Sequence, residues 1–459
     1  MKKVLSTVAA LALVAGVASN AMALDEPSRA SESEATTAPR VATPTAPGVA
    51  LWSVAGQWVL AGAYVDGGKG NPGGADVQDE YSANDAFYIY SFKLLPVLQI
   101  NDKISMKGEV RIDDRCVFGT SCGKDDHLRD ADFKHVYMEW VSPYGKTRFG
   151  RTPAGAWGPS FMNSTGQGDR LMWWPNFMPE NWGMLLFTQK INERDATIPG
   201  ESDGDADGYY VDINYKADFG KTIAAIWSVR NSSTEGDGDD TVSGQFRLTG
   251  DYKFGDFGVT YEWNQNFADG PNDPNTGDAT DSKGTGVMVD LNYTMNDWKF
   301  GGLFFYMSGD DDPTDGDTEA MFTKGNGTGK DYNPYQIMTG DYMNLLNGDN
   351  PLSPGANDAL FVDGASSGVI SFGGYVGWKM SPKLSLSAEV GYFAATDEPD
   401  DYDDDYGIEF GIGMAYKVMD NLEYFAHFSF LSTGDYWEQN GAYDTEDVWL
   451  AAHALSMKF

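Results

Sequence analysis

The chain contains few residues of the kinds that bind metals, with two cysteines and four histidines among 459 residues. Cys116 and Cys122 lie close together in one polar stretch, and a single pair lacks the further Cys or His ligands of a structural zinc site. If the chain is exported, this spacing predicts a disulfide within one loop, with two free thiols as the alternative. Neither a metal site nor a cofactor is therefore expected.

Basic residues are also few, since 32 Lys and Arg stand against 68 Asp and Glu, which gives a formal net charge of −36. Nucleic acid requires a basic surface, so it is not an expected partner of this acidic chain, and docking on anionic lipid through a basic patch is not expected either. Many carboxylates lie in loop-like runs such as residues 310–312 and 400–405. The run at residues 203–207 resembles the start of a calcium loop, but Asn214 replaces the bidentate glutamate, which favours a hydrated acidic loop.

No later apolar run approaches the roughly 20 residues that a membrane-spanning helix needs. Near the N-terminus, a short apolar run at residues 4–18 follows two lysines and precedes Ala21-Met-Ala23. This order predicts a cleaved signal peptide over residues 1–23, with a membrane anchor as the alternative. Residues 24–50 are rich in Ala, Thr, Ser, Glu and Pro without periodicity, and they are predicted to form a flexible linker.

From Leu51 onward, apolar and polar residues alternate in segments of about ten residues. In residues 257–263, for example, Phe, Val, Tyr and Trp alternate with Gly, Thr and Glu. Such a strand has one apolar and one polar face, because successive side chains point to opposite sides. In a bilayer every backbone group must find an internal partner, so these strands are expected to close into a barrel.

The connections between these segments alternate between tight turns and long acidic, Gly-rich loops, as the two rims of an outer-membrane barrel do. The sequence therefore predicts an all-β transmembrane antiparallel barrel over residues 51–459, with about 16 strands, short periplasmic turns and long extracellular loops. The predicted tight turns lie at residues 101–103, 142–145, 218–220, 254–256, 295–297, 381–383 and 419–421.

The last segment carries Trp449, His453 and Phe459 on one face, and outer-membrane barrels characteristically end on such a phenylalanine, which the barrel-assembly machinery reads. With it, residues 411–424 and 432–437 resemble the closing hairpin of the homotrimeric outer-membrane porins of sulfate-reducing bacteria. This resemblance implies a homotrimer in a Gram-negative outer membrane, surrounded by lipid and lipopolysaccharide, through which small polar solutes diffuse. The Pro/Thr-rich linker and the long loop at residues 309–366 depart from that family.

A barrel of this size encloses a lumen that wall side chains cannot fill, and in general porins the third outer loop folds inward to narrow it. The matching connection here begins after Arg151 and is expected to run to at least Trp182. Its many aromatic residues predict packing against the inner wall, with a loop folded over the rim or against a neighbouring subunit as the alternative. The candidate pore-constriction residues are Lys107, Glu109, Arg111, Glu139, Arg148, Asp169, Arg170 and Glu180.

These charges predict a transverse field across the pore if basic wall residues face loop carboxylates, whereas solvated lumen charges without that role are the alternative. Because inward carboxylates outnumber inward bases in the expected strands, the pore is predicted to be weakly cation-selective. A channel selective for a sugar or an organic acid, or a structural or adhesive barrel, are the other interpretations.

Catalysis is not expected. Glu423, His427 and Ser429 share one strand face, but residues in one column are not expected to converge into a base–nucleophile pair. The sequence also lacks a Gly-x-Ser-x-Gly elbow and a pair of zinc-binding histidines.

Overall fold

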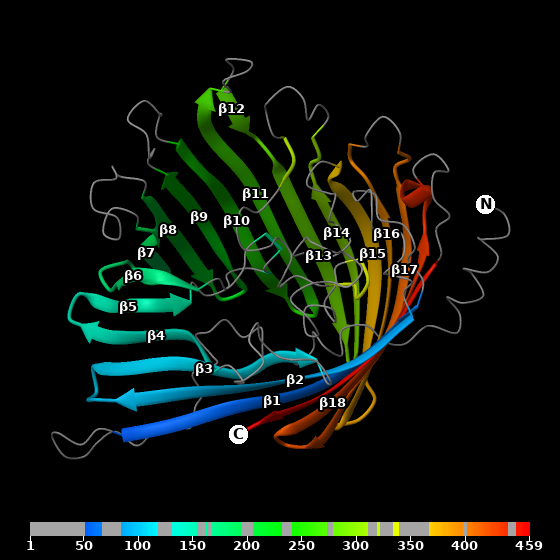
Figure 1. The fold of residues 1–459 in the computed structure, drawn as a ribbon, viewed down its shortest axis with the longest axis horizontal. Helices are drawn as coiled ribbons and strands as arrows, with labels where there is room; N and C mark the ends of the chain where they lie inside the picture. Colours follow the sequence, from blue (N-terminus) through cyan, green and yellow to red (C-terminus); the bar gives the residue numbers. More distant parts are fainter. Residues whose placement is uncertain are drawn as a thin grey trace.

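The alternating segments pair in one antiparallel sheet, each strand with its neighbour along the chain, in the computed structural model (Figure 1). The strands are β1 (Leu51–Asp66), β2 (Asn84–Gln99), β3 (Ile104–Val117), β4 (Ala131–Ser142), β5 (Gly145–Pro153), β6 (Gln167–Pro175), β7 (Trp182–Asn192), β8 (Ala206–Ala217), β9 (Gly220–Asn231), β10 (Thr241–Phe254), β11 (Phe257–Asn272), β12 (Ala279–Ser282), β13 (Thr285–Met295), β14 (Trp298–Met307), β15 (Val369–Lys379), β16 (Leu384–Ala394), β17 (Asp405–Met419), β18 (Leu422–Thr433) and β19 (Val448–Lys458). The structure describes residues 51–66, 84–117, 131–153, 159, 161–162, 167–193, 205–231, 241–272, 279–310, 319–321, 334–338, 367–397, 402–438 and 447–459. The predicted signal peptide and linker lie outside these residues.

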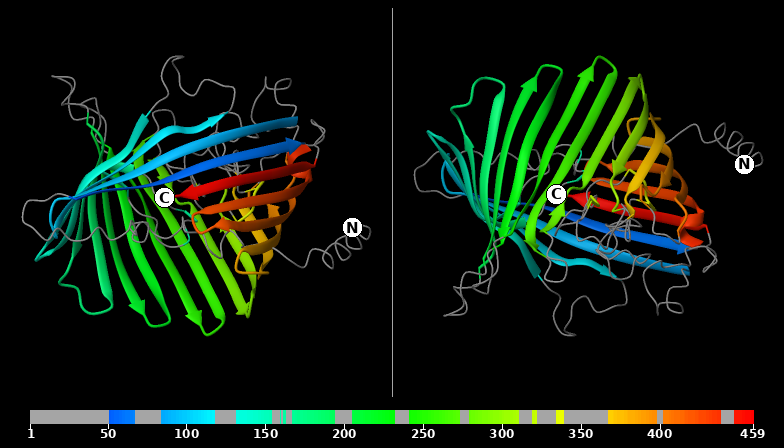
Figure 2. Two further views of the ribbon diagram at one scale, coloured as in Figure 1. Left: turned by 90° about the horizontal axis from the view of Figure 1, so that it is seen from below. Right: turned by 90° about the horizontal axis from the view of Figure 1, so that it is seen from above.

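The sheet closes because β19 returns beside β1 (Figure 2). Their antiparallel register runs from the pair Gln57–Lys458 to the pair Asp66–Trp449. Closure leaves the wall without an edge strand, so each of its strands has a hydrogen-bonded neighbour on each side. The predicted class, a closed antiparallel β-barrel, is confirmed.

The predicted strand number is too low, because the wall contains 18 strands. The four-residue β12 pairs with the end of β11 and lies two residues before β13, so it is not counted as a separate strand of the wall. The strands missed by the prediction are β6 and β7, which lie where one long loop was expected to reach Trp182. That expectation is wrong because aromatic residues such as Trp173 and Trp174 belong to β6, and a connection of a few residues leads to β7.

The seven predicted tight turns all join consecutive strands at one end of the barrel. In two of them, Gly255 (φ 64°) and Asn296 (φ 54°) adopt the left-handed backbone conformation that two-residue turns require. The long connections all lie at the opposite end. No helix in the part of the chain that the structure describes is long and apolar enough to cross a membrane.

The outer face of the barrel is apolar, with large side chains exposed along successive strands. Near the turn end, Tyr215, Tyr293 and Tyr416 are exposed, in keeping with an aromatic girdle at the membrane surface. At the closing strands, the amide N–H groups of Gly56 and Phe459 each donate to the carbonyl oxygen of the other, at 2.8 and 3.0 Å. Apolar side chains thus face lipid, and the polar face of each strand points into the barrel.

Candidate functional site

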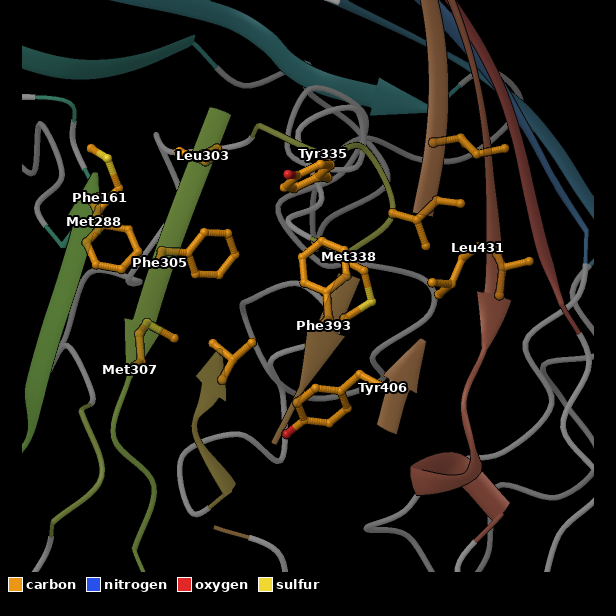
Figure 3. Close-up of a cluster of buried hydrophobic side chains, with 14 of the residues drawn as sticks. Phe161, Met288, Leu303, Phe305, Met307, Tyr335, Met338, Phe393, Tyr406 and Leu431 are labelled. Carbon is orange, nitrogen blue, oxygen red and sulfur yellow. The ribbon is translucent and has the colours of Figure 1, made fainter. Parts of the chain in front are cut away.

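The inner wall of the barrel is divided into an apolar part and a charged part. Near the loop end of β13 to β19 and of β1, inward side chains are apolar and buried, among them Leu303, Phe305, Phe393 and Leu431 (Figure 3). By contrast, β2 to β6 carry several inward charged side chains, among them Lys93, Glu139 and Arg148. Water and solutes can therefore pass along the charged part, whereas the apolar part requires a cover.

Segments of the long connections cover the apolar part. Residues 161–162 of the β5–β6 connection, and residues 321, 335, 337 and 338 of the β14–β15 connection, are buried in the same cluster as the wall residues. The rings of Phe161 and Phe305 lie 5.8 Å apart, and those of Tyr335 and Phe393 lie 5.0 Å apart in an edge-to-face contact (Figure 3). The described segments of both connections thus lie inside the barrel and narrow the lumen from the same side.

Two wall glutamates bind these inward segments. Glu262 of β11 accepts hydrogen bonds from the backbone N–H groups of Phe161 (3.2 Å) and Met162 (2.9 Å). Glu409 of β17 accepts three, from the N–H groups of residues 336 (2.8 Å), 337 (2.9 Å) and 338 (2.8 Å). Both carboxylates are fully buried. Their partners lie roughly 70 to 100 positions away in sequence.

Tyr335 occupies a recess in the wall. A Cβ atom at Gly373 or Gly391 would collide with its side chain, so the recess exists because both positions lack one. Burial raises the pKa of the Tyr335 hydroxyl, as do the nearby carboxylates of Glu389 and Glu409, so this hydroxyl stays neutral.

The charged part of the wall contains a set of ion pairs that we call the basic wall cluster. Its first half is built around Glu109 of β3, which is buried. Lys93 Nζ lies 3.2 Å from Glu109 Oε2, Arg111 Nε lies 2.6 Å from Oε1, and His135 Nε2 lies 3.9 Å from Oε2. One carboxylate thus faces two permanent cations and one histidine.

The second half of the cluster is built around Glu139 of β4. Lys107 Nζ and Arg148 Nε lie 3.1 and 2.8 Å from its two oxygens. The Arg148 guanidinium also lies over the rings of Tyr137 (5.2 Å) and Trp174 (5.1 Å), which hold it against the wall.

Two further bases extend the cluster along β5 and β6. The Lys146 ammonium lies 4.3 Å above the Trp174 ring. Arg170 is buried, and it donates to the Thr152 carbonyl and the Gln189 amide oxygen, each at 2.8 Å. With six basic side chains around two carboxylates, the cluster has an excess of positive charge.

The structure brings six of the eight sequence-predicted site residues to the inner wall and leaves two outside it. All six, Lys107, Glu109, Arg111, Glu139, Arg148 and Arg170, belong to the basic wall cluster.

The other two do not face the lumen, and all three residues assigned to the predicted loop lie elsewhere. Asp169 and Arg170 belong to β6, and Asp169 shares the outward face with the exposed Leu171. There, Asp169 lies 3.9 Å from the guanidinium of Arg151. Glu180 is exposed in the β6–β7 turn, at the opposite rim from the inward segments.

Lys93 and Lys146, which complete the cluster, were not predicted, and neither was the function of Glu262 and Glu409 as binding partners of loops. Lys146 shares a face of β5 with Arg148, so strand parity could have found it, whereas Lys93 shares its face of β2 with Ile89, Leu95 and Val97 and has no such signal. The backbone partners of the two glutamates give no sequence signal.

The expectation that His427 and Ser429 do not converge is wrong. His427 Nε2 lies 3.0 Å from Ser429 Oγ, and also 3.1 Å from Glu389 Oε1, which reaches it from β16 across the intervening β17. Both partners face the same ring nitrogen, whereas a triad needs the carboxylate on one nitrogen and the hydroxyl on the other. This geometry provides no relay for a nucleophile.

The remaining predicted sites fall partly outside the described residues. Cys122 lies outside them, so the predicted disulfide with Cys116 stays a prediction. Of the acidic run at 203–207, the described Asp205 and Asp207 both pair with Lys190, the latter at 3.3 Å. These two carboxylates bind a lysine, which fits a charged rim loop better than a calcium loop.

No protein-family model matches the chain, and no curated protein matches it significantly. Solved structures do match its fold. OccK9 (OpdG) of Pseudomonas aeruginosa is 13% identical with a TM-score of 0.53, and the match covers 89% of this chain and 98% of that one. OccK11 (OpdR) of the same bacterium is 10% identical with a TM-score of 0.52, covering 89% and 96%. The outer membrane protein OpdK, also from that bacterium, is 9% identical with a TM-score of 0.51, covering 89% and 98%. The chain therefore has the fold of a Gram-negative outer-membrane β-barrel.

Proposed function

We propose that the chain is an outer-membrane channel through which small hydrophilic solutes and ions diffuse passively. The observation that carries this proposal is the divided inner wall, in which a charged part borders the remaining lumen while loop segments cover the apolar part. An adhesive or purely structural barrel would have no need of a charged wall beside an inward-folded constriction. Such a wall provides favourable positions for water and ions along the barrel axis.

Ion preference follows from two opposing features. The chain as a whole is strongly acidic, and much of that charge lies in the long outer connections, which favours cations at the mouth and supports weak cation selectivity. The basic wall cluster favours anions deeper in the pore. It supports the second candidate function, a channel selective for a small organic acid, whose carboxylate would compete with Glu109 and Glu139 for the surrounding bases.

The oligomeric state in this proposal is the homotrimer that the sequence resemblance implies. Lipid and lipopolysaccharide would surround the trimer, and the barrel-assembly machinery would insert each subunit after export by the signal peptide.

Single-channel recording of refolded protein in planar bilayers tests the proposal. We expect ohmic current steps that come in threes, with a reversal potential in a KCl gradient that reports weak cation selectivity. Current that a small carboxylate blocks, and that an uncharged sugar of similar size leaves unchanged, would favour the organic-acid channel. A folded protein without conductance would refute both candidate functions.

A further inference from the structure

Three consecutive backbone amides face a single carboxylate inside this barrel. The N–H groups of residues 336 and 337 donate to Glu409 Oε1 at 2.8 and 2.9 Å, and that of residue 338 donates to Oε2 at 2.8 Å. Consecutive amides that converge in this way form a concave site for an anion. Here the anion belongs to the wall, and the side chain that carries it is fully buried.

The carboxylate provides hydrogen-bond acceptors for the backbone N–H groups of a loop segment that is buried inside the barrel. Residues 335, 337 and 338 are buried among apolar side chains, where water cannot reach the backbone (Figure 3). An amide N–H without a partner there is strongly unfavourable, and one carboxylate satisfies three of them with charge-assisted bonds. The side-chain contacts of Tyr335 in its glycine recess position one end of this segment, whereas Glu409 binds its backbone.

The same arrangement occurs independently on another strand. Glu262 of β11, also fully buried, accepts the N–H groups of Phe161 and Met162 from the other inward connection, and Asn264 Nδ2 donates to it at 3.0 Å. Two unrelated strands and two unrelated connections thus use one type of contact. This recurrence indicates that the contact serves the inward folding of loops in general in this barrel.

We propose that Glu409 is a positioning residue of the channel, which holds residues 336–338 against the β17 wall and thereby determines the free cross-section of the lumen and the largest solute that passes. This inference rests on the proposed diffusion function. Glu409 itself does not touch the solute, because its side chain is fully buried and its carboxylate oxygens accept the backbone N–H groups of residues 336–338.

Three variants test the proposal in planar bilayers and in liposome-swelling assays with neutral sugars of increasing size. Glu409→Gln keeps the volume but replaces one acceptor with a donor, and Glu409→Ala removes the group. The matched control is Glu423→Gln, on the inner face of β18, eight residues from Leu431, the register partner of Glu409. That separation is about 26 Å along the strand.

We expect both Glu409 variants to fold, as shown by their heat-modifiable migration on gels, and to admit larger sugars than the wild type. Their open-channel current should fluctuate between levels and spend about tenfold more time at the level of the displaced segment, since one lost charge-assisted hydrogen bond changes an equilibrium by roughly that factor. The control should match the wild type in both assays.

Acetate in the bath distinguishes the loss of the Glu409 contact from a general loss of stability, because acetate can replace the missing carboxylate but cannot restore a destabilised barrel. In Glu409→Ala, acetate fits the space of the missing carboxylate and should return current fluctuations and the size limit toward the wild type, with no such effect on the control. Folded Glu409 variants with wild-type currents and size limits, or fluctuations unaffected by acetate, would overturn the inference and leave the diffusion function standing. A silent wild type whose Glu409 variants conduct would support the positioning role and refute the open channel, whereas silence of every variant would refute both.

Discussion

Removal of the Glu139 charge should shift the ion preference of the pore toward anions. In the basic wall cluster this carboxylate lies 3.1 Å from Lys107 and 2.8 Å from Arg148, and its side chain keeps 16% of its surface exposed. In Glu139→Gln, the two cations lose their counter-charge and face the lumen with one more net positive charge. Nearby K⁺ is then repelled and nearby Cl⁻ attracted.

The magnitude follows from Coulomb's law. An ion that passes about 6 Å from the released charge, in surroundings with a dielectric constant of about 80, changes in energy by about 0.7 kcal/mol. That is roughly threefold in occupancy for each ion, with opposite sign for K⁺ and Cl⁻. With partial screening in 0.1 M salt, the K⁺/Cl⁻ permeability ratio should fall by about three- to tenfold. In 1 M KCl, where the Debye length is about 3 Å, most of the difference should disappear.

Reversal potentials in KCl gradients at low and high salt measure this shift. The matched control is Glu180→Gln, the same substitution in the exposed β6–β7 turn, which should leave the ratio unchanged. Arg148→Gln should shift the ratio in the opposite direction. If Glu139→Gln is folded and conducting but keeps the wild-type ratio at low salt, permeating ions do not pass the basic wall cluster.

Three further substitutions test the packing of the barrel. Gly391→Ala would place a Cβ 2.6 Å from the Tyr335 ring, so the Tyr335 side chain should leave its recess and enter the lumen. The single-channel conductance should then fall, and an unchanged conductance would argue against the recess. Phe459→Ala removes a ring that stacks on Phe92 at a centroid distance of 6.1 Å, and should lower the free energy of unfolding by about 1 kcal/mol in urea titrations of protein refolded in lipid. Phe305→Ala empties a fully buried site and should lower it by about 3–5 kcal/mol in the same titration, so a loss below 1 kcal/mol would show that the cluster is loosely packed.

The barrel could be predicted from the sequence because its main signals are local. Alternation with period two reports a strand with one face toward lipid and one toward water, and tight turns report where strands reverse. In β11, the outward Phe257 and Trp263 alternate with the inward Glu262, and the segment was assigned correctly. Neither signal depends on a distant partner.

The β6–β7 hairpin was missed because one of its strands has no such alternation. The inward residues of β6 include Met172 and Trp174, and the outward ones include Leu171 and Trp173. Both faces are apolar, and Trp174 is inward because it lies beneath the cation of Arg148. When an inward aromatic ring, such as that of Trp174, packs against a cation, the inner face of the strand contains an apolar residue where a polar one is expected. The sequence of such a strand then shows no alternation and resembles an apolar loop.

The site could be predicted only as far as strand parity allows. Parity places Lys107, Glu109 and Arg111 on one face, but the pairs that each makes depend on the register of neighbouring strands. The contacts of the inward segments join residues that are even farther apart in the sequence, since Phe161 and Glu262 are separated by 101 positions. No local pattern encodes such a contact.

Strands that are apolar on both faces nevertheless carry information about the lumen. On β14, the inward Leu303 and Phe305 are as apolar as the outward Phe300 and Phe304. Exposed to a water-filled pore, such inward side chains would be unfavourable by about 25 cal/mol per Å² of apolar surface, so they are stable there only beneath a cover. A doubly apolar strand in an otherwise alternating barrel therefore predicts that a loop folds inward over it. By the same argument, the strands that keep a charged inner face show where the remaining pathway lies.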